Sequence, residues 1–133
     1  MVPAIRRGLE REGSHIECLS AITLATHDIG RAVGFYEDLG FELVKGGREA
    51  GFTTFRAGAQ FLNITAEAPH RIWNWWGRAI FYVTDVDSTY RQAVNRGIVP
   101  DFAPRNAHWG ERFFHLTDPD GHEISFARPL LER

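Results

Sequence analysis

The sequence lacks the features that mark secreted and membrane-spanning chains. It contains a single cysteine, Cys18, so no internal disulfide can form and no disulfide-stabilised secreted domain is indicated. No apolar run is long enough to cross a bilayer, and charged residues interrupt the N-terminal segment where a signal peptide would need an apolar core. We therefore predict a cytoplasmic protein that has no membrane partner.

An excess of basic residues is also missing. The formal net charge of −2 disfavours nucleic acid as the main partner, because phosphate binding favours a basic surface. Hydrophobic residues make up 44% of the 133 residues, which suits one globular domain with a modest core.

What the sequence does contain is a repeated order of strand and helix. A strand-like run leads to Asp28, a good N-cap, and the apolar periodicity that follows predicts a helix ending at Gly40. The same order recurs later, where a strand-like run leads to Asp85 and a predicted helix ends at Gly97. The two aspartates and the two glycines are separated by the same number of residues, which indicates an internal repeat.

Each copy of the repeat is predicted to be a β-α-β-β-β module. The predicted strands are 19–26, 41–44, 52–56 and 60–65 in the first copy, and 79–83, 98–102, 112–116 and 123–126 in the second. We expect an α+β fold in which the two modules form a curved mixed sheet that encloses a cleft, paired within the chain or across a dimer.

The predicted boundaries follow from this repeat. One domain spans 18–129, its modules are 18–67 and 77–129, and a tryptophan-rich loop at 68–76 joins them. Residues 1–17 are predicted to be an N-terminal tail or an arm that packs on a partner subunit, and 130–133 a short C-terminal tail.

Side-chain alternation along the strands assigns one face to the helices and the other to the cleft. The helix-facing positions are uniformly apolar or small, whereas the opposite positions are mixed. The predicted cleft-facing residues are Ala21, Thr23, Phe61, Asn63, Arg78, Ile80, Tyr82, Glu123 and Ser125.

A strand, a tight turn and a second strand are predicted near the C-terminus. In the turn Asp-Pro-Asp-Gly at 118–121, Pro119 presets φ and Gly121 supplies the positive φ that closes the turn. Together with the repeat and the aspartate-capped first helix, this hairpin resembles the vicinal oxygen chelate superfamily. That superfamily includes glyoxalase I, extradiol dioxygenases, fosfomycin-resistance enzymes and bleomycin-resistance proteins, and the resemblance covers about 19–129.

The resemblance implies where a metal would be held. In metal-dependent members a divalent cation lies in the cleft, and its ligands are usually histidine on the first strand and glutamate on the last strand of each module. At those positions this sequence has Ala21 and Arg78 on the first strands, and Asn63 and Ser125 on the last strands. Alanine has no ligand atom, arginine is a permanent cation, and neutral oxygens are poor ligands for such a cation. We therefore predict no metal and no other cofactor, with a divalent metal as the alternative.

Two residues are weak candidates for acid–base catalysis. His115 lies on the strand before the hairpin, and Glu123 shares a strand face with Ser125. The alternatives are a hydrogen-bonded structural histidine and a solvated carboxylate at a strand edge. His27 is interpreted as a surface turn residue and His122 as a residue that shapes the hairpin turn.

The tryptophans are the other unusual feature. Trp73, Trp75, Trp76 and Trp109 lie in loops that border the predicted cleft, where they either pack in the core or a dimer interface, or form an aromatic clamp for a planar or cationic ligand. Arg78 either holds a ligand carboxylate or phosphate, or pairs with a glutamate of the same chain. The predicted ligand-binding residues are Asn63, Trp76, Arg78, Trp109 and Ser125.

These observations support three functional hypotheses. The first is a metal-free protein of the bleomycin-resistance type that binds a small aromatic or amphipathic molecule in the cleft, at a homodimer interface. The alternative is a lyase, isomerase or dioxygenase of the same fold, which uses a divalent metal at other positions or acid–base chemistry by His115 and Glu123. The third is a dimerisation platform without a ligand.

Overall fold

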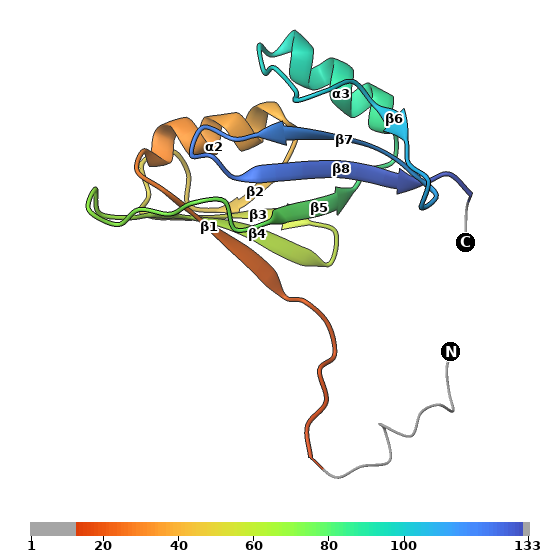
Figure 1. The fold of residues 1–133 in the computed structure, drawn as a ribbon. Helices are drawn as coiled ribbons and strands as arrows, with labels where there is room; N and C mark the ends of the chain where they lie inside the picture. The colour runs from red at the N-terminus through yellow and green to blue at the C-terminus, as the bar shows by residue number, and fades with distance from the viewer. Residues whose placement is uncertain (1–12, 132–133) are drawn as a thin grey trace.

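The computed structural model describes residues 13–131, which form two helices and eight strands (Figure 1). The first module contains β1 (Ala21–Thr26), α2 (Ile29–Asp38), β2 (Glu42–Lys45), β3 (Phe52–Ala57) and β4 (Gln60–Ala66). The second contains β5 (Arg78–Tyr82), α3 (Val86–Asn95), β6 (Arg105–Asn106), β7 (Glu111–Thr117) and β8 (Glu123–Pro129).

Each module has its own four-stranded mixed sheet, and the two sheets have the same topology. The strand orders are β1-β4-β3-β2 and β5-β8-β7-β6. In each sheet the first strand pairs in parallel with the last, with Ala21 opposite Phe61 in one and Arg78 opposite Glu123 in the other. The predicted α+β fold of two β-α-β-β-β modules is therefore confirmed.

The two helices begin and end in the same way. The Asp28 carboxylate accepts a hydrogen bond from the backbone N–H of Arg31, and Asp85 accepts one from Ser88. Both caps have extended backbone and satisfy a donor that the first helical turn leaves unpaired. After each helix a glycine with positive φ turns the chain back toward its sheet, as the sequence predicts.

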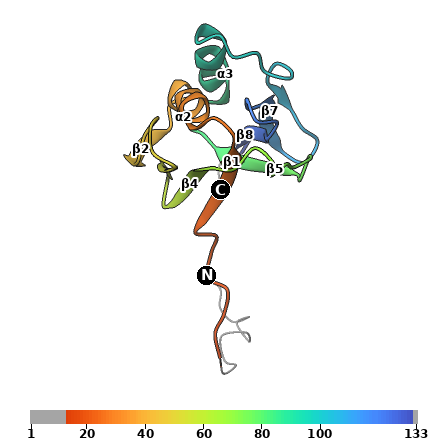
Figure 2. The same cartoon turned by 90° about the vertical axis from the view of Figure 1, so that its left-hand side faces the viewer.

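The helices lie next to each other on one side of the two sheets (Figure 2). Gln92 of α3 donates to the Asp38 carbonyl oxygen at 3.1 Å, and Arg96 pairs with the Asp38 carboxylate at 3.2 Å. One hydrophobic core runs through both modules, so the modules do not fold as separate bodies. Its buried side chains include Leu24, Tyr36, Phe55, Leu62, Ile64, Phe114, Leu116, Ile124 and Phe126.

No helix within residues 13–131 covers the opposite face of the sheets, which we call the open face. Thr23 on β1 and Arg78, Ile80 and Tyr82 on β5 are exposed there. The helix-facing side of the same strands is buried or half-buried, which confirms the predicted alternation.

Three details differ from the sequence prediction. Residues 98–102 form no strand, because the Ile98 N–H bonds back to the Ala93 carbonyl at the end of α3 and Pro100 has no N–H to donate. The short strand β6 comes later instead, at Arg105–Asn106. The first strand begins at Ala21 rather than at residue 19. Much of the predicted N-terminal tail (1–12), and the last two residues (132–133), lie outside the described residues.

None of the helices within residues 13–131 is long and apolar enough to span a membrane.

Replacing Asp85 tests the cap of α3. Asp85→Ala should lower the free energy of unfolding by about 1 kcal/mol, because the Ser88 N–H loses its acceptor. Asp85→Asn, which keeps an acceptor oxygen, should stay close to the wild type in urea denaturation. Equal losses in both variants would show that the cap hydrogen bond contributes nothing measurable.

Candidate functional site

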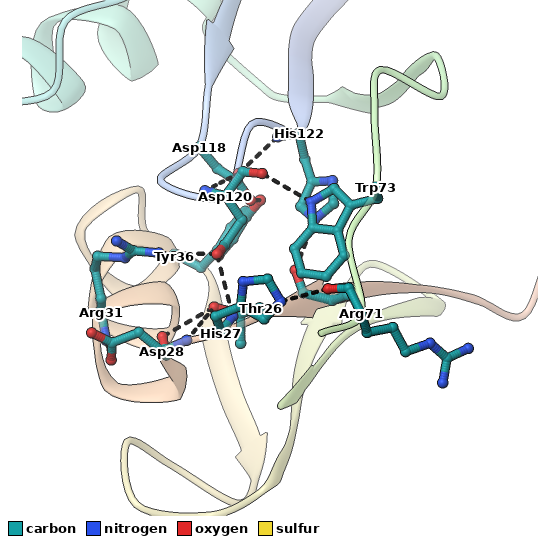
Figure 3. Close-up of polar contacts among 11 residues, drawn as sticks. Thr26, His27, Asp28, Arg31, Tyr36, Arg71, Trp73, Asp118, Asp120 and His122 are labelled. Carbon is teal, nitrogen blue, oxygen red and sulfur yellow. Dashed lines mark hydrogen bonds and ion pairs between the residues drawn. The ribbon is translucent and has the colours of Figure 1, made fainter. Parts of the chain in front are cut away.

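The hairpin of the second module is bound to the first module through a buried carboxylate (Figure 3). Asp118 accepts a hydrogen bond from the Tyr36 hydroxyl of α2 at 2.7 Å, and its other oxygen accepts the backbone N–H groups of Asp120 and His122 at 2.9 Å each. Burial raises the pKa of Asp118, although these hydrogen bonds oppose the shift. Burial, and then the Asp118 charge, raise the pKa of Tyr36 well above its ordinary value, so its hydroxyl remains a donor.

A second aspartate of the hairpin extends this connection. Asp120 pairs with Arg31 of α2 at 3.0 Å, and the same oxygen accepts the His27 N–H at 3.4 Å. Its other oxygen, Oδ2, is buried and has no hydrogen-bond partner among the described residues. The hairpin therefore holds the end of β1 and the start of α2, and its two carboxylates are engaged in structural contacts.

Three aromatic rings are stacked beside the hairpin. Trp73 packs between His27, at 4.5 Å between ring centroids, and His122, at 5.7 Å. The Trp73 indole N–H also donates to the Asp120 carbonyl at 3.0 Å, and His27 Nε2 lies 2.6 Å from the Arg71 carbonyl. His27 is exposed in the bend after β1, which confirms its interpretation as a surface turn residue, and it also packs on Trp73, which has a packing role.

His122 joins the loop between the modules to the first strand. Its Nε2 donates to the Ala25 carbonyl at 2.8 Å, and its Nδ1 accepts the Trp76 indole N–H at 2.7 Å. Only the neutral imidazole with its proton on Nε2 satisfies both bonds. The interpretation of His122 as a turn residue is incomplete, since its buried ring fixes Trp76 in place.

Trp73, Trp76 and His122 form one wall of a pocket of about 470 Å³, which we call the Trp-loop pocket. Strand β1 supplies its floor, and the end of β4 together with the loop supplies its rim. Its lining includes Ile22, Thr23, Ala25, Thr65, Glu67, Arg71, Trp76 and His122.

A polar cluster lies on the open face of the second sheet, and we call it the open-face cluster. Arg78 pairs with the Glu123 carboxylate at 2.5 Å, and His115 Nδ1 lies 3.2 Å from the same oxygen. The other Glu123 oxygen accepts the Trp75 indole N–H at 2.9 Å. The structure thus brings together both acid–base candidates and the predicted ligand-binding Arg78. The alternative prediction, that Glu123 is a solvated carboxylate at a strand edge, is wrong, because β8 lies between β5 and β7.

The cluster shifts the protonation of its members. Burial raises the pKa of Glu123, but hydrogen bonds from Arg78 and Trp75 and the nearby positive charge outweigh it, so the net pKa is lowered. Burial and the Arg78 charge lower the pKa of His115, while the Glu123 charge opposes them. The cluster therefore holds an ionised glutamate beside a neutral imidazole at neutral pH.

The other predicted ligand-binding residues are spread over the open face. Asn63 donates to the Thr23 hydroxyl and accepts from Thr54. Ser125 is buried opposite His115 in the β7–β8 register. Trp109, at the far end of β7, is 59% exposed and donates its indole N–H to Glu111 at 3.0 Å.

The residues at the expected metal positions do not suit a divalent cation. Ala21 offers no ligand atom, Arg78 is a cation paired with Glu123, and the Asn63 amide is bound to two threonines. Within residues 13–131, no three side chains among histidine, cysteine, aspartate and glutamate lie close enough to hold a metal ion. The donor set of this face therefore does not fit the metal that the fold family implies.

Comparison with known families assigns the chain. The sequence model of the glyoxalase/bleomycin resistance protein/dioxygenase superfamily matches residues 18–126, which is most of the chain. The chain belongs to this superfamily. Its resemblance to the vicinal oxygen chelate fold is thereby confirmed.

Solved structures of this superfamily have the same fold. A glyoxalase/bleomycin resistance protein/dioxygenase from Nocardioides superimposes with a TM-score of 0.71 at 19% identity, covering 91% of this chain and 89% of that chain. A bleomycin resistance determinant encoded on the transposon Tn5 reaches 0.70 at 26% identity, covering 86% and 100%. A bleomycin-binding protein complexed with bleomycin reaches 0.67 at 27% identity, covering 85% and 98%.

A curated relative is similar over a shorter stretch. An uncharacterized protein of Mycobacterium bovis is 38% identical over 50 residues, which are 38% of this chain and 33% of that protein. The match thus spans about a third of the length of that relative.

The contacts of Tyr36, His122 and Trp73 are not predicted by the sequence. Tyr36 belongs to the apolar stripe of the first helix, where a tyrosine predicts a buried ring but not the partner of its hydroxyl. Asp118 and His122 fit the turn pattern equally well with or without long-range contacts.

Removing the Tyr36 hydroxyl tests the connection between the modules. Tyr36→Phe should lower the free energy of unfolding by about 1–3 kcal/mol, because a buried carboxylate oxygen loses its donor. Tyr90→Phe is the matched control, since Tyr90 of α3 packs on Phe114 and has no carboxylate partner in the part of the chain that the structure describes. Chemical denaturation that gives equal, small losses for both variants would contradict the structural role of Asp118.

The open-face cluster makes a prediction about the pKa of His115. Glu123→Gln should lower this pKa further, because it removes the charge that stabilises the imidazolium form, and Arg78→Gln should raise it, because it removes the opposing charge. NMR titration of the His115 ring protons measures both changes. Shifts in the same direction in the two variants would rule out the electrostatic coupling described here.

Proposed function

We propose that this protein binds a small aromatic or amphipathic molecule on its open face without using a metal, as a protein of the bleomycin-resistance type. The observation that carries the proposal is the open-face cluster. Arg78 and Glu123 neutralise each other on the strands where metal-dependent members of the fold hold their ligands. The face is therefore equipped with hydrogen-bonding and aromatic groups rather than with a cation site.

The aromatic side chains of this face support the proposal. The rings of Trp75 and Trp109 are 65% and 59% exposed, while the indole N–H of each is fixed by a glutamate. An anchored indole loses little conformational entropy when a planar ligand stacks on it. The similar Tn5 bleomycin resistance determinant and the bleomycin-binding protein complexed with bleomycin agree with a ligand of this class.

We further propose that the ligand lies at a homodimer interface in the cytoplasm. Ile80 and Tyr82 are more than half exposed on a sheet face that no helix covers. A second copy of the chain would cover these side chains and turn the open face into a closed cleft. The single cysteine, which allows no internal disulfide, supports the cytoplasmic location.

A second candidate function is acid–base catalysis by a lyase, isomerase or dioxygenase of this superfamily. The observation that favours it is the 3.2 Å contact between His115 and Glu123, together with the lowered pKa of His115. A neutral imidazole can accept a proton from a substrate, and the adjacent carboxylate would orient it and stabilise the imidazolium that forms. Glu123→Gln should then abolish turnover, whereas a binding protein shows no turnover to lose.

Metal content and thermal stability test the proposal. The purified full chain, free of any tag, should contain no stoichiometric metal, and its melting temperature should be the same in EDTA and in excess Zn²⁺, Ni²⁺, Mn²⁺ or Fe²⁺. A metal that binds only the folded state must raise the midpoint by mass action. A stoichiometric metal or a clear shift with one ion would contradict the metal-free function.

Ligand binding is tested with a panel of planar aromatic compounds that begins with metal-free bleomycin. At least one should give a saturable change in tryptophan fluorescence that EDTA does not alter, and Trp109→Phe should reduce its amplitude. The same chains in analytical ultracentrifugation should sediment as a dimer. A panel without any saturable response would favour the dimerisation platform instead.

A further inference from the structure

The Trp-loop pocket is completed by residues of a single chain. Hydrogen bonds within the chain hold its aromatic wall in place. The Trp76 indole N–H donates to His122, and His122 donates to the Ala25 carbonyl of β1. The pocket therefore exists without a partner subunit, unlike a cleft that two open faces would enclose. Its volume of about 470 Å³ lies within the range of small-molecule sites.

The rim of this pocket carries two opposite charges. Arg71 Nη1 lies 3.3 Å from one Glu67 oxygen, and the Thr65 hydroxyl lies 3.3 Å from the other. Both contacts are at the long end of the hydrogen-bond range, and the Arg71 side chain is largely exposed. An exposed pair of this kind contributes little to stability, so a ligand can replace either contact at small cost.

The floor of the pocket is largely apolar, with Thr23 as the one polar residue that β1 contributes, and its inner wall is aromatic. Ile22 and Ala25 line it from β1, and Trp76 and His122 close it from the side. The polar atoms of His122 are already satisfied within the chain, so the inner part offers contact area rather than free donors. An apolar or aromatic group fits inside, while charged groups fit only at the rim.

We propose that the Trp-loop pocket binds a zwitterionic α-amino acid with an aromatic or bulky apolar side chain. The ammonium group would pair with Glu67 and the carboxylate with Arg71, while the side chain enters against Trp76. A ligand with only one charge would pair with one of the two residues and leave the other without a partner. A zwitterion replaces the internal ion pair by two contacts and leaves neither charge unpaired.

This site goes beyond the proposed function, because it adjoins the open face at Thr23 but none of its lining residues belongs to the open-face cluster. The indole N–H signals of Trp73 and Trp76 report the pocket, whereas that of Trp109 reports the far end of the open face. The two sites can therefore be followed separately in one NMR spectrum of the full chain.

The experiment is a titration with L-phenylalanine, followed by the four indole N–H signals. The signals of Trp73 and Trp76 should shift in a saturable way while that of Trp109 does not. Phenylacetate lacks the ammonium group and phenethylamine lacks the carboxylate. Each should bind roughly twofold to fivefold more weakly than L-phenylalanine, which is the range expected for an exposed charge pair. L-Alanine, which lacks the aromatic group, should bind more weakly still.

Two variants test the rim, and a third is their control. Glu67→Gln and Arg71→Gln should each weaken L-phenylalanine binding by roughly twofold to fivefold. Arg48→Gln removes a similarly exposed ion pair, which Arg48 forms with Glu37 of α2 at 3.0 Å. This variant should leave L-phenylalanine binding unchanged. Circular dichroism and the wild-type indole pattern confirm that each variant is folded.

Several results would overturn the inference. Equal affinity for phenylacetate or phenethylamine would show an aromatic pocket that does not recognise a zwitterion. Unchanged affinity in both rim variants would place the amino acid elsewhere, and no shift at the solubility limit of L-phenylalanine would leave no such site. None of these results alters the metal-free function proposed for the open face, which is reported by Trp109 and the thermal measurements.

Discussion

The arrangement of the two modules depends on the hydrogen bonds of the buried Asp118 carboxylate. It is buried, and it accepts one hydrogen bond from Tyr36 of the first module and two from the backbone of its own hairpin. A buried carboxylate without these donors would be strongly unfavourable, so the hairpin and α2 must keep this relative position. The hairpin then sets the position of His122, and through its ring the position of Trp76.

On the open face, the opposite charges of Arg78 and Glu123 neutralise each other near the solvent. Arg78 and Glu123 are brought opposite each other by the parallel pairing of β5 and β8. His115 is added from β7, whose antiparallel register with β8 places it beside the same carboxylate. Residue identity at a few strand positions therefore separates this chain from a metal-dependent enzyme on the same fold, since the fold alone does not decide the function.

Local patterns predict much of the fold. The Asp28 and Asp85 caps, the glycines that follow the helices and the alternation along the strands depend on near neighbours, and each is read from a few residues. From the sequence alone, the same alternation predicts that Arg78, Glu123 and Asn63 lie on one face of the sheets. The strand predicted at 98–102 is wrong. The apolar residues between Gly97 and Pro100 have strand-like composition, but the Ile98 N–H is used in the hydrogen bond that ends α3.

The candidate site is predicted only in part, and the missing part consists of contacts between distant segments. The bonds from Tyr36 to Asp118 and from His122 to Ala25 join residues from opposite ends of the chain. Periodicity shows that these residues are buried or in a turn, but it contains no information about the partner across the core. The pocket beside Trp76 depends on those same contacts and so becomes visible only in the structure.

The Tyr36–Asp118 bond positions the aromatic loop through the hairpin. The most direct measurement is the hydrogen exchange of the four indole N–H groups in wild type and in Tyr36→Phe, under conditions where both are folded. We expect faster exchange for Trp73 and Trp76, whose acceptors belong to the hairpin, and no change for Trp109, whose acceptor Glu111 is a near neighbour in sequence. Unchanged exchange at Trp73 and Trp76, or equal acceleration of all four groups, would contradict it.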